Sequence, residues 1–256
     1  MKFLIRAKVD TIIKRYPIDS SILPNGQKRT ILAGTEILAV NCAIVPNNHI
    51  SFLTFQDNNY IGKWYAFAPH VEAFNDGKLI VSDLVAKDQA EYIFENKIFD
   101  NELADLNHCL KTFGITNKED IRMFLAQCGH ESGGLKWLKE LATGDDYEWR
   151  SDLGNNKSGD GRRFKGSGVI QLTGRSNYQD FANYTGDHRI MEGVDYVANT
   201  YPFSSAGFWW MNNKMSKFIA NGATIQQVST RVNGANPANG LSDRIKYYER
   251  AKVVIL

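Results

Sequence analysis

Two kinds of hydrophobic pattern divide the chain near residue 80. In residues 1–78, short runs alternate apolar and polar positions, as at 3–10, and aromatic or aliphatic runs follow at 50–53 and 64–67. Turn sequences rich in Pro, Asn, Asp and Gly separate the runs, as at 24–26, 33–34 and 75–77. Alternation with a period of two between such turns is typical of half-buried β-strands. This part of the chain therefore predicts a small β-barrel or sandwich.

After residue 80 the apolar positions recur at i, i+3 and i+4, which is the period of an amphipathic helix. The first three helices are predicted from Ala90, Ile93 and Phe94, then Leu103, Leu106 and Leu110, then Ile121, Phe124, Leu125 and Cys128. Further helices are expected at about 177–185, 203–213, 225–232 and 241–253. The pattern predicts an α+β protein whose second part, residues 83–256, is mostly helical.

Helix boundaries are also predicted by capping residues. Thr116 with Glu119, and Thr224 with Gln227, have the spacing of a capping box at a helix start. Glycines end helices because they adopt left-handed backbone angles easily, so the pair at 133–134 should end the third helix and Gly186 a later one. The polar, glycine-rich stretch 142–176 is long for a compact helical domain, and we expect a functional loop or unrecognised hairpins there.

Composition excludes some classes of function. The net charge is +2, made of +3 before residue 80 (9 Lys+Arg, 6 Asp+Glu) and −1 after it (21 and 22), so nucleic-acid binding is not expected. Charged residues interrupt the first ten positions and no apolar run reaches 18 residues, so we expect neither a signal peptide nor a membrane span. The three widely spaced cysteines match no disulfide framework or metal knuckle, and we expect reduced, mostly buried thiols.

The first candidate for chemistry is the segment HisGluSer at 130–132. It ends a predicted apolar helix, where the negative end of the helix dipole tends to keep a proton on Glu131, as a general acid requires. A solvated surface carboxylate is the alternative from position alone. A zinc-protease motif would need histidine at 134, where the chain has Gly134, so His130 is better interpreted as a structural, hydrogen-bonding histidine.

A second carboxylate has four candidates, which are Glu140, Asp145, Asp146 and Glu148. In an uninterrupted helix Glu140 would lie on the opposite face from Glu131 and roughly 13 Å along the axis. The two glycines break the helix, so the chain can turn back and bring Glu140 across a cleft. The residues alone do not choose among the four, each of which is otherwise a loop-surface charge.

Two further segments, 161–178 and 201–211, are candidates for binding a ligand. The stretch 161–178 matches neither a dinucleotide fingerprint nor a P-loop. Its glycines, interleaved with Gln171, Thr173 and Asn177, are typical of a groove floor that offers amide and hydroxyl groups to a sugar, although such residues also cap helices. The aromatic segment 201–211 is better interpreted as core than as a binding platform.

The order of motifs in residues 83–256 resembles glycoside hydrolase family 19. The motifs are AQCGHESGG, a glutamate nine residues after Glu131, GRRFKGSGVIQLTGRSNY, the Phe-Trp-Trp helix and RVNGANPANGLSDRIKYYER. The resemblance implies a lysozyme-like, mostly α catalytic domain that cleaves β-1,4 bonds between N-acetylated sugars with inversion. Its members include chitinases and phage endolysins.

The resemblance also implies roles for single residues. Glu131 would protonate the glycosidic oxygen, and Glu140 would be the base that activates water from the opposite face. Inverting pairs stand about 6.5–9.5 Å apart, which leaves room for that water. Thr173 would orient the water, and the remaining implied sugar-site residues are Gln171, Asn177, Asn233 and Arg244.

The chain departs from the plant members of the family, which carry several disulfides and longer loops. The absence of such a cysteine set favours the bacterial or phage branch. The charged loop 142–160 keeps Glu148 as an alternative base. Residues 1–78 resemble, more weakly, a bacterial SH3-like wall-targeting module, through LeuProAsnGly, AlaGlyThrGlu and TrpTyrAlaPhe.

These observations predict an endolysin-type glycosidase that needs no cofactor or metal. Residues 1–78 would be an SH3-like cell-wall-binding barrel and residues 83–256 the catalytic domain. The substrate would be peptidoglycan, with chitin as the alternative, and we expect no nucleic-acid or membrane partner and a monomer. The protein would be made in the cytoplasm and reach the wall after release, in a phage-infected host.

Two alternative functions belong to other classes. A non-catalytic wall- or carbohydrate-binding protein is disfavoured because both Glu131 and Glu140 are present. A wall amidase or peptidase is disfavoured because no metal-ligand set stands out, and Cys128 and His130 are spaced to point to different sides of a helix.

Overall fold

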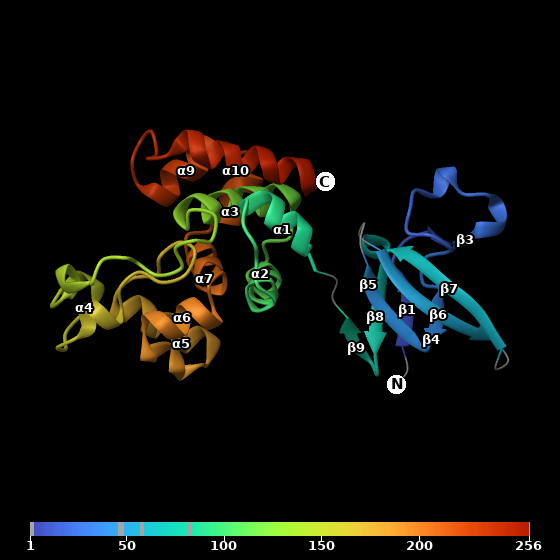
Figure 1. The fold of residues 1–256 in the computed structure, drawn as a ribbon, viewed down its shortest axis with the longest axis horizontal. Helices are drawn as coiled ribbons and strands as arrows, with labels where there is room; N and C mark the ends of the chain where they lie inside the picture. Colours follow the sequence, from blue (N-terminus) through green and yellow to red (C-terminus); the bar gives the residue numbers. More distant parts are fainter. Residues whose placement is uncertain (1–2, 46–48, 57–58, 81–82, 256) are drawn as a thin grey trace. The chain divides into compact units, whose positions relative to one another are not determined.

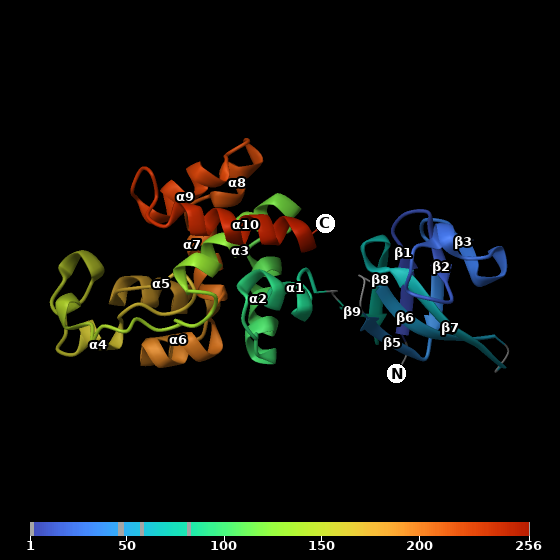
Figure 2. The ribbon, with the colours of Figure 1, turned by 45° about the horizontal axis from the view of Figure 1, so that its top comes forward.

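The computed structural model describes residues 3–45, 49–56, 59–80 and 83–255. The chain divides into two compact units, residues 1–83 and residues 84–256. The first unit consists of strands and short 3-10 turns, and the second is built from helices (Figures 1 and 2). This confirms the predicted α+β class, with strands preceding helices.

The first unit contains two antiparallel sheets, with strand orders β4-β1-β8-β9 and β3-β2-β7-β6-β5. The strands are β1 (Phe3–Ala7), β2 (Thr11–Lys14), β3 (Lys28–Ile31), β4 (Glu36–Ala39), β5 (Asn41–Val45), β6 (His49–Gln56), β7 (Asn59–Phe67), β8 (Val71–Asn75) and β9 (Lys78–Ile80). The 3-10 turns are η1 (Ser20–Ile22), η2 (Asn25–Gln27) and η3 (Ala68–His70). Two sheets agree with the predicted barrel or sandwich, whereas likeness to an SH3 module stays a prediction.

The alternating pattern of β1 decides which face is buried. Ile5 and Ala7 point into a core shared by both sheets, while Arg6 lies between them on the outer face and pairs with Glu36 at 2.8 Å. Ile5 is paired in register with Ile37 on one side and Ala73 on the other. Because side chains alternate across a strand, this register places Ile5 and Ala7 of β1 on the same buried face as Val71 and Ala73 of β8.

The second unit contains ten α-helices within its described residues. They are α1 (Lys87–Phe94), α2 (Asp100–Thr112), α3 (Lys118–Glu131), α4 (Asp160–Arg163), α5 (Arg175–Thr185), α6 (Val194–Thr200), α7 (Ser204–Asn212), α8 (Met215–Ala220), α9 (Ile225–Asn233) and α10 (Leu241–Val254). All seven predicted helices are confirmed, and α4, α6 and α8 were not predicted because they are too short to show a clear period. No helix in the described part of the chain is both long and apolar enough to cross a membrane.

Helix α3 lies at the centre of this unit, and Ile121, Phe124, Leu125 and Cys128 are buried in its core. It packs most extensively on α10, as Figure 1 shows. Its N-cap is Asn117, whose side chain accepts from the Glu119 N–H at 2.9 Å, so the predicted capping box at Thr116 is wrong by one residue. The predicted box of Thr224 and Gln227 is confirmed, as is the end of α5 at Gly186.

The long polar stretch 142–176 has little regular structure and contains one buried carboxylate, Asp160. It contains α4 and two 3-10 turns, η4 (Asp145–Tyr147) and η5 (Ser151–Leu153). Asp160 is only 2% exposed; it accepts from the backbone N–H groups of Asn156 and Lys157, both at 2.9 Å, and from both arms of the Arg175 guanidinium. The hydrogen bonds from Arg175 lower the pKa of Asp160 to about 2. The loop is therefore anchored to the start of α5.

Replacing Asp160 by Asn should lower the free energy of unfolding by about 2 kcal/mol near pH 6, because a carboxylate pKa depressed by nearly two units is worth about that much. The folded pKa lies below the unfolded one, so this contribution is present above about pH 4 and is lost as the pH falls towards 2. Urea unfolding at several pH values measures both effects. Asp180→Asn, at an exposed position on α5, is the matched control. Equal stability of the two variants at pH 6 would contradict the anchoring role.

Candidate active site

Glu131 is the last residue of α3, and the chain turns sharply after it. Gly133 and Gly134 have φ values of +59° and +70°, in the left-handed region that favours glycine. The Gly134 N–H donates to the Gly129 carbonyl at 2.7 Å, closing the helix end. The Ser132 hydroxyl donates to the Cys128 carbonyl and accepts from the Leu135 N–H. The predicted end of the helix is confirmed, and it leaves Glu131 partly exposed at the end of a buried helix.

The Glu131 carboxylate is oriented by a buried guanidinium. Arg244 on α10 is fully buried, and its Nη2 donates to Glu131 Oε1 at 2.5 Å. Its Nη1 donates to Gln127 Oε1 at 2.5 Å and its Nε to the Asn239 carbonyl at 3.2 Å. Gln127 lies one turn before Glu131 and itself donates to Ser229 on α9 at 3.2 Å. Arg244 is thus fixed on several sides. It therefore sets the direction of the Glu131 carboxylate, which is partly exposed to solvent.

His130 has a structural environment. Its Nδ1 lies 2.8 Å from Asp243 Oδ2, and its ring packs on Gly240, where a side chain would collide with it. Cys128 is buried in the core on another side of the helix, so the two residues do not form a nucleophile and base pair. Within the described ranges no group of three or more His, Cys, Asp or Glu side chains is arranged to hold a metal ion.

Glu140 is held by a short two-stranded contact. Lys139 forms an isolated antiparallel bridge with Ser167, and the Glu140 N–H donates to the Gly166 carbonyl at 2.9 Å. The Gly166 N–H donates in turn to Glu140 Oε2 at 2.9 Å, and the Tyr147 hydroxyl donates to Oε1 at 2.9 Å. Burial, followed by this bond to Glu140, raises the pKa of Tyr147, which keeps the phenol a donor. Both carboxylate oxygens therefore have fixed partners.

Gln171, Thr173 and Asn177 form a chain of contacts beside Glu140. Gln171 has a φ of +62° and donates through Nε2 to the carbonyls of Gly168 at 2.9 Å and Trp137 at 3.3 Å. The Thr173 hydroxyl donates to the Gln171 carbonyl at 2.9 Å, and the Asn177 amide donates to the Thr173 carbonyl at 2.7 Å. The structure therefore links these three predicted residues to one another, and it brings Gln171 next to Glu140 at Gly166.

Asn233 joins the other group of predicted residues, around Glu131. Its Oδ1 accepts from the Asn239 N–H at 2.8 Å, and the carbonyl of Asn239 accepts from Arg244. Asn233 therefore shapes the segment that holds Arg244. The predicted residues form two groups, one around Glu131 and one around Glu140.

Trp137 links these two groups. Its indole packs against Gly133, since a Cβ there would lie 2.8 Å from Trp137 Cδ1, and its carbonyl accepts from Gln171. The Trp137 side chain is also 49% exposed. A large, exposed apolar ring on the segment that connects the two carboxylates is suited to stacking on a sugar ring. Its position six residues after Glu131 was not singled out from the sequence.

A cavity of about 510 Å³ opens beside Glu140, and we call it the lysine cavity. Its lining includes Glu140 and Trp137, three lysines and Asp195 from α6; the lysines are Lys136, Lys139 and Lys165. Lys139 pairs with Asp195 at 2.9 Å, and the Lys165 ammonium donates to the Ala142 carbonyl at 2.7 Å. Lys136 is exposed and makes no ion pair with the described residues. The cavity therefore presents positive charge next to the candidate base.

Of the other candidate carboxylates, Glu148 and Asp145 have structural partners within the loop, and none of the three lines the lysine cavity. Glu148 Oε1 and Oε2 accept from the N–H groups of Gly159 at 2.7 Å and Gly161 at 2.8 Å, and Glu148 does not line the lysine cavity. Asp145 is paired with Arg162. Asp146 is exposed. Of the four candidates, Glu140 is thus the one that lines the lysine cavity.

The aromatic helix α7 belongs to the core, as predicted. Trp210 is 1% exposed and donates from Nε1 to Asp120 Oδ1 at 2.9 Å, while Trp209 is partly buried against the same core. Sequence reasoning missed Gln127 and Tyr147. The first stands four residues before Glu131, a helical spacing that places it on the same face, whereas nothing in the sequence pairs Tyr147 with Glu140.

Comparison with known proteins shows relatives that carry the name of one glycosidase family. No family model matches the chain. A "glycosyl hydrolase family 19 domain-containing protein" of Haemophilus influenzae is 29% identical over 194 residues, which cover 62% of this chain and 93% of that protein. Chitinase 5 of Oryza sativa is 28% identical over 141 residues, 52% of this chain, and the match spans 47% of that plant protein.

Solved structures show the same fold. A bacterial family 19 chitinase superposes with a TM-score of 0.57 at 22% identity, covering 67% of this chain and 95% of that one. Chitinase C of Streptomyces griseus gives a TM-score of 0.54 at 21% identity, covering 68% and 93%. Together with the names of the relatives, these neighbours support membership of glycoside hydrolase family 19 and a glycosidase enzyme.

Gly166 offers a test of how the Glu140 group is held. A Cβ at this position would collide with Gln171 Oε1 and lie 3.1 Å from Glu140 Oε2. Both are ends of flexible side chains, so Gly166→Ala should move them at little cost to stability. We expect at least a tenfold lower turnover number, measured as new reducing ends released from glycan, with a melting temperature within a few degrees of the parent.

Gly26→Ala is the control for that substitution, because nothing lies within 4 Å of a Cβ at Gly26. Full activity in Gly166→Ala would show that the packing of Glu140 and Gln171 on Gly166 is not needed for the reaction.

Proposed function

We propose that this chain is an endolysin-type glycosidase that hydrolyses the β-1,4 bonds of peptidoglycan glycan strands by an inverting mechanism. The observation that carries the proposal is the pair Glu131 and Glu140, each held by its own hydrogen bonds and joined by a connector, residues 132–139, that carries the exposed ring of Trp137. The likeness in fold to family 19 chitinases supports the same reaction class.

In this mechanism Glu131 donates a proton to the glycosidic oxygen as the bond to the anomeric carbon breaks. Its position at the end of α3 leaves the carboxyl partly exposed, while Arg244 fixes its direction. Glu140 removes a proton from a water molecule that attacks the opposite face of the sugar. Tyr147 and Gly166 hold the Glu140 carboxylate in place, which lowers the cost of ordering it for the reaction.

In this proposal the remaining predicted residues position the water and the groups around the two carboxylates. Gln171, Thr173 and Asn177 shape the groove floor next to Glu140, and Asn233 supports the segment that holds Arg244. Thr173 orients the attacking water in this proposal. Glu140 is preferred to Glu148 as the base because it borders the lysine cavity, whereas Glu148 binds two backbone amides of its own loop.

The charge of the lysine cavity favours peptidoglycan over chitin. Chitin carries no charge, whereas muramic acid carries a lactyl carboxylate or the peptide attached to it. Lys136, Lys139 and Lys165 would attract such an acidic substituent next to the bond that is cleaved. Chitin remains the alternative substrate, because the family resemblance alone does not separate the two sugars.

We propose in addition that the β-unit is an SH3-like module that binds the cell wall and increases the local concentration of the catalytic unit there. The separate core of this unit, around Ile5, Phe52 and Ala66, supports an independent role. The enzyme would act on the wall after release from an infected host cell.

Glu131→Gln and Glu140→Gln should each lower the turnover number at least a hundredfold, because a positioned general acid or base contributes about 10²–10⁴ in rate. Release of reducing ends from purified peptidoglycan measures the loss, and circular dichroism checks the fold. Glu192→Gln, at an exposed site, is the control and should keep full activity. Intact activity of Glu131→Gln would refute the catalytic assignment, whereas an inactive parent would support the non-catalytic alternative.

Mass spectrometry of digested peptidoglycan should find new reducing ends at glycan bonds, and proton NMR of the first product should show the inverted anomer. Digestion of chitin oligomers in parallel decides between the substrates. Activity confined to chitin would refute the peptidoglycan proposal. New amino groups in place of reducing ends would indicate an amidase or peptidase.

Lys136→Met should lower activity on peptidoglycan several-fold while activity on any neutral chitin oligomer that is cleaved stays unchanged, because only the acidic substrate uses the charge. Lys118→Met, at an exposed position at the start of α3, is the control. The comparison is made at low and at 0.5 M salt, where screening should remove the difference. An equal loss on both substrates would assign Lys136 a role unrelated to charge.

A further inference from the structure

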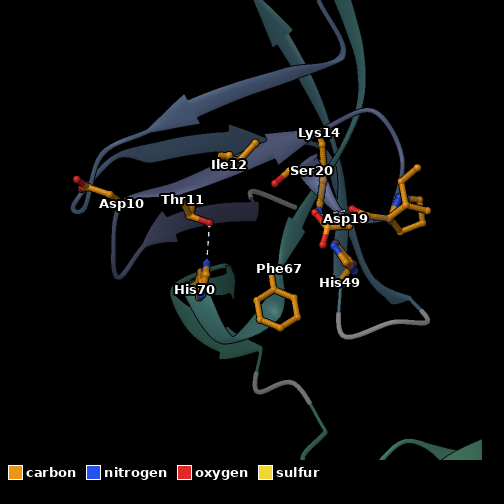
Figure 3. Close-up of a pocket in the computed structure, with 11 residues that line it drawn as sticks. Asp10, Thr11, Ile12, Lys14, Asp19, Ser20, His49, Phe67 and His70 are labelled. Carbon is orange, nitrogen blue, oxygen red and sulfur yellow. Dashed lines mark hydrogen bonds between the residues drawn. The ribbon is translucent and has the colours of Figure 1, made fainter. Parts of the chain in front are cut away.

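The β-unit contains a cavity of about 640 Å³, which falls within the size range of ligand sites. Strand β2, the segment 17–20 and residues His49, Phe67 and His70 line it (Figure 3). Because the cavity lies wholly within residues 1–83, it is separate from the glycosidase site.

Lys14 is the unusual residue of this cavity. It is only 7% exposed, although lysine is rarely buried without a partner of opposite charge. Its ammonium donates to the Ile18 carbonyl at 2.5 Å, and among the described residues it makes no ion pair. Burial lowers the pKa of Lys14, an effect that the nearby charge of Asp19 partly offsets. A partly desolvated ammonium with donors to spare is suited to bind an anion.

The two carboxylates that line the cavity already have partners on the backbone. Asp19 Oδ1 accepts from the Ser21 N–H at 2.7 Å, at the start of the turn η1. Asp10 Oδ1 accepts from the Ala33 N–H at 2.8 Å, and Figure 3 shows Asp10 at the end of the cavity away from Lys14. Neither pairs directly with the Lys14 ammonium.

Three aromatic rings form one wall of the cavity, and Phe67 is the apolar one. Phe67 lies edge to face with His49, with centroids 5.7 Å apart, and with His70 at 5.0 Å. The Nδ1 atom of His70 is hydrogen-bonded to the Thr11 hydroxyl at 2.9 Å, which fixes the ring against β2. Such a wall is suited to a small apolar side chain.

The sheet opens at this place. Among the described residues, strands β2 and β7 are paired in register only at Lys14 and Tyr65, so the pairing does not extend to Thr11 and Ile12, which line the cavity. An extended peptide is the ligand that matches a strand edge, because backbone groups and alternate side chains are recognised together.

From these contacts we propose that the cavity binds a short peptide that ends in a free carboxylate, with the Lys14 ammonium receiving the carboxylate and Phe67 and His70 contacting the terminal side chain. A wall peptide with a terminal alanine has this chemistry, and so does a free small organic acid. The proposal does not depend on glycan hydrolysis.

The test is calorimetric titration of the full chain with N-acetyl-Ala-Ala-Ala and with its C-terminal amide. The free acid should bind at least tenfold more tightly than the amide, and sodium propionate should bind much more weakly than the peptide. Lys14→Met should abolish the preference for the acid. Lys8→Met, at an exposed position of the same unit, should keep it.

Folding and activity are measured on the same variants. Lys14→Met should melt no lower than the parent, because methionine fills a similar space without a buried charge. It should hydrolyse soluble glycan fragments at the parental rate, so failure of the glycosidase proposal and failure of this one are distinguishable. Equal binding of acid and amide, a preserved preference in Lys14→Met, or no binding of the peptide acid would overturn the proposal, and tighter binding of propionate than of the peptide would assign the cavity to a small acid.

Discussion

The arrangement around Glu131 depends on the burial of one guanidinium. A buried charge needs an opposite charge and acceptors for its donors, and Arg244 finds them in Glu131, Gln127 and the Asn239 carbonyl. These partners come from α3 and from the segment before α10, so satisfying one cation joins the two elements that pack most extensively in the helical unit. The stability of that contact and the direction of the candidate acid therefore have the same cause.

Residues 132–139 connect the two candidate carboxylates, from the end of α3 to the backbone contact that holds Glu140. Left-handed glycines stop α3 directly after Glu131, and the chain then pairs at Lys139 with Ser167, which presents Glu140 to the Gly166 N–H. Glycine is needed at 166 because the side chains of Glu140 and Gln171 occupy the space of a Cβ. Each carboxylate is held by groups from a different part of the unit, so neither can move freely when a substrate binds.

A buried or partly buried cation has a different role in each of the two units. Arg244 donates to Glu131, Gln127 and the Asn239 carbonyl and so positions another residue, whereas Lys14 donates to the Ile18 carbonyl and lines a cavity. The same physical cost of burying a charge thus supports a structural role in one unit and a proposed binding role in the other. In the lysine cavity three lysines lie beside Glu140, and in the proposed function their field attracts a charged substrate.

The sequence by itself determined the α+β class, the seven longer helices and the end of α3, because periodicity and glycine backbone preference are local properties. It also determined Glu131 as a candidate, through its position at that helix end. Only the tertiary structure decided that Gln127 and Arg244 share one bond network, that Tyr147 binds Glu140, and that Trp137 links the two groups. These contacts join residues from 7 to 117 positions apart, and a cavity such as that around Lys14 exists only once distant strands meet, so no local pattern encodes them.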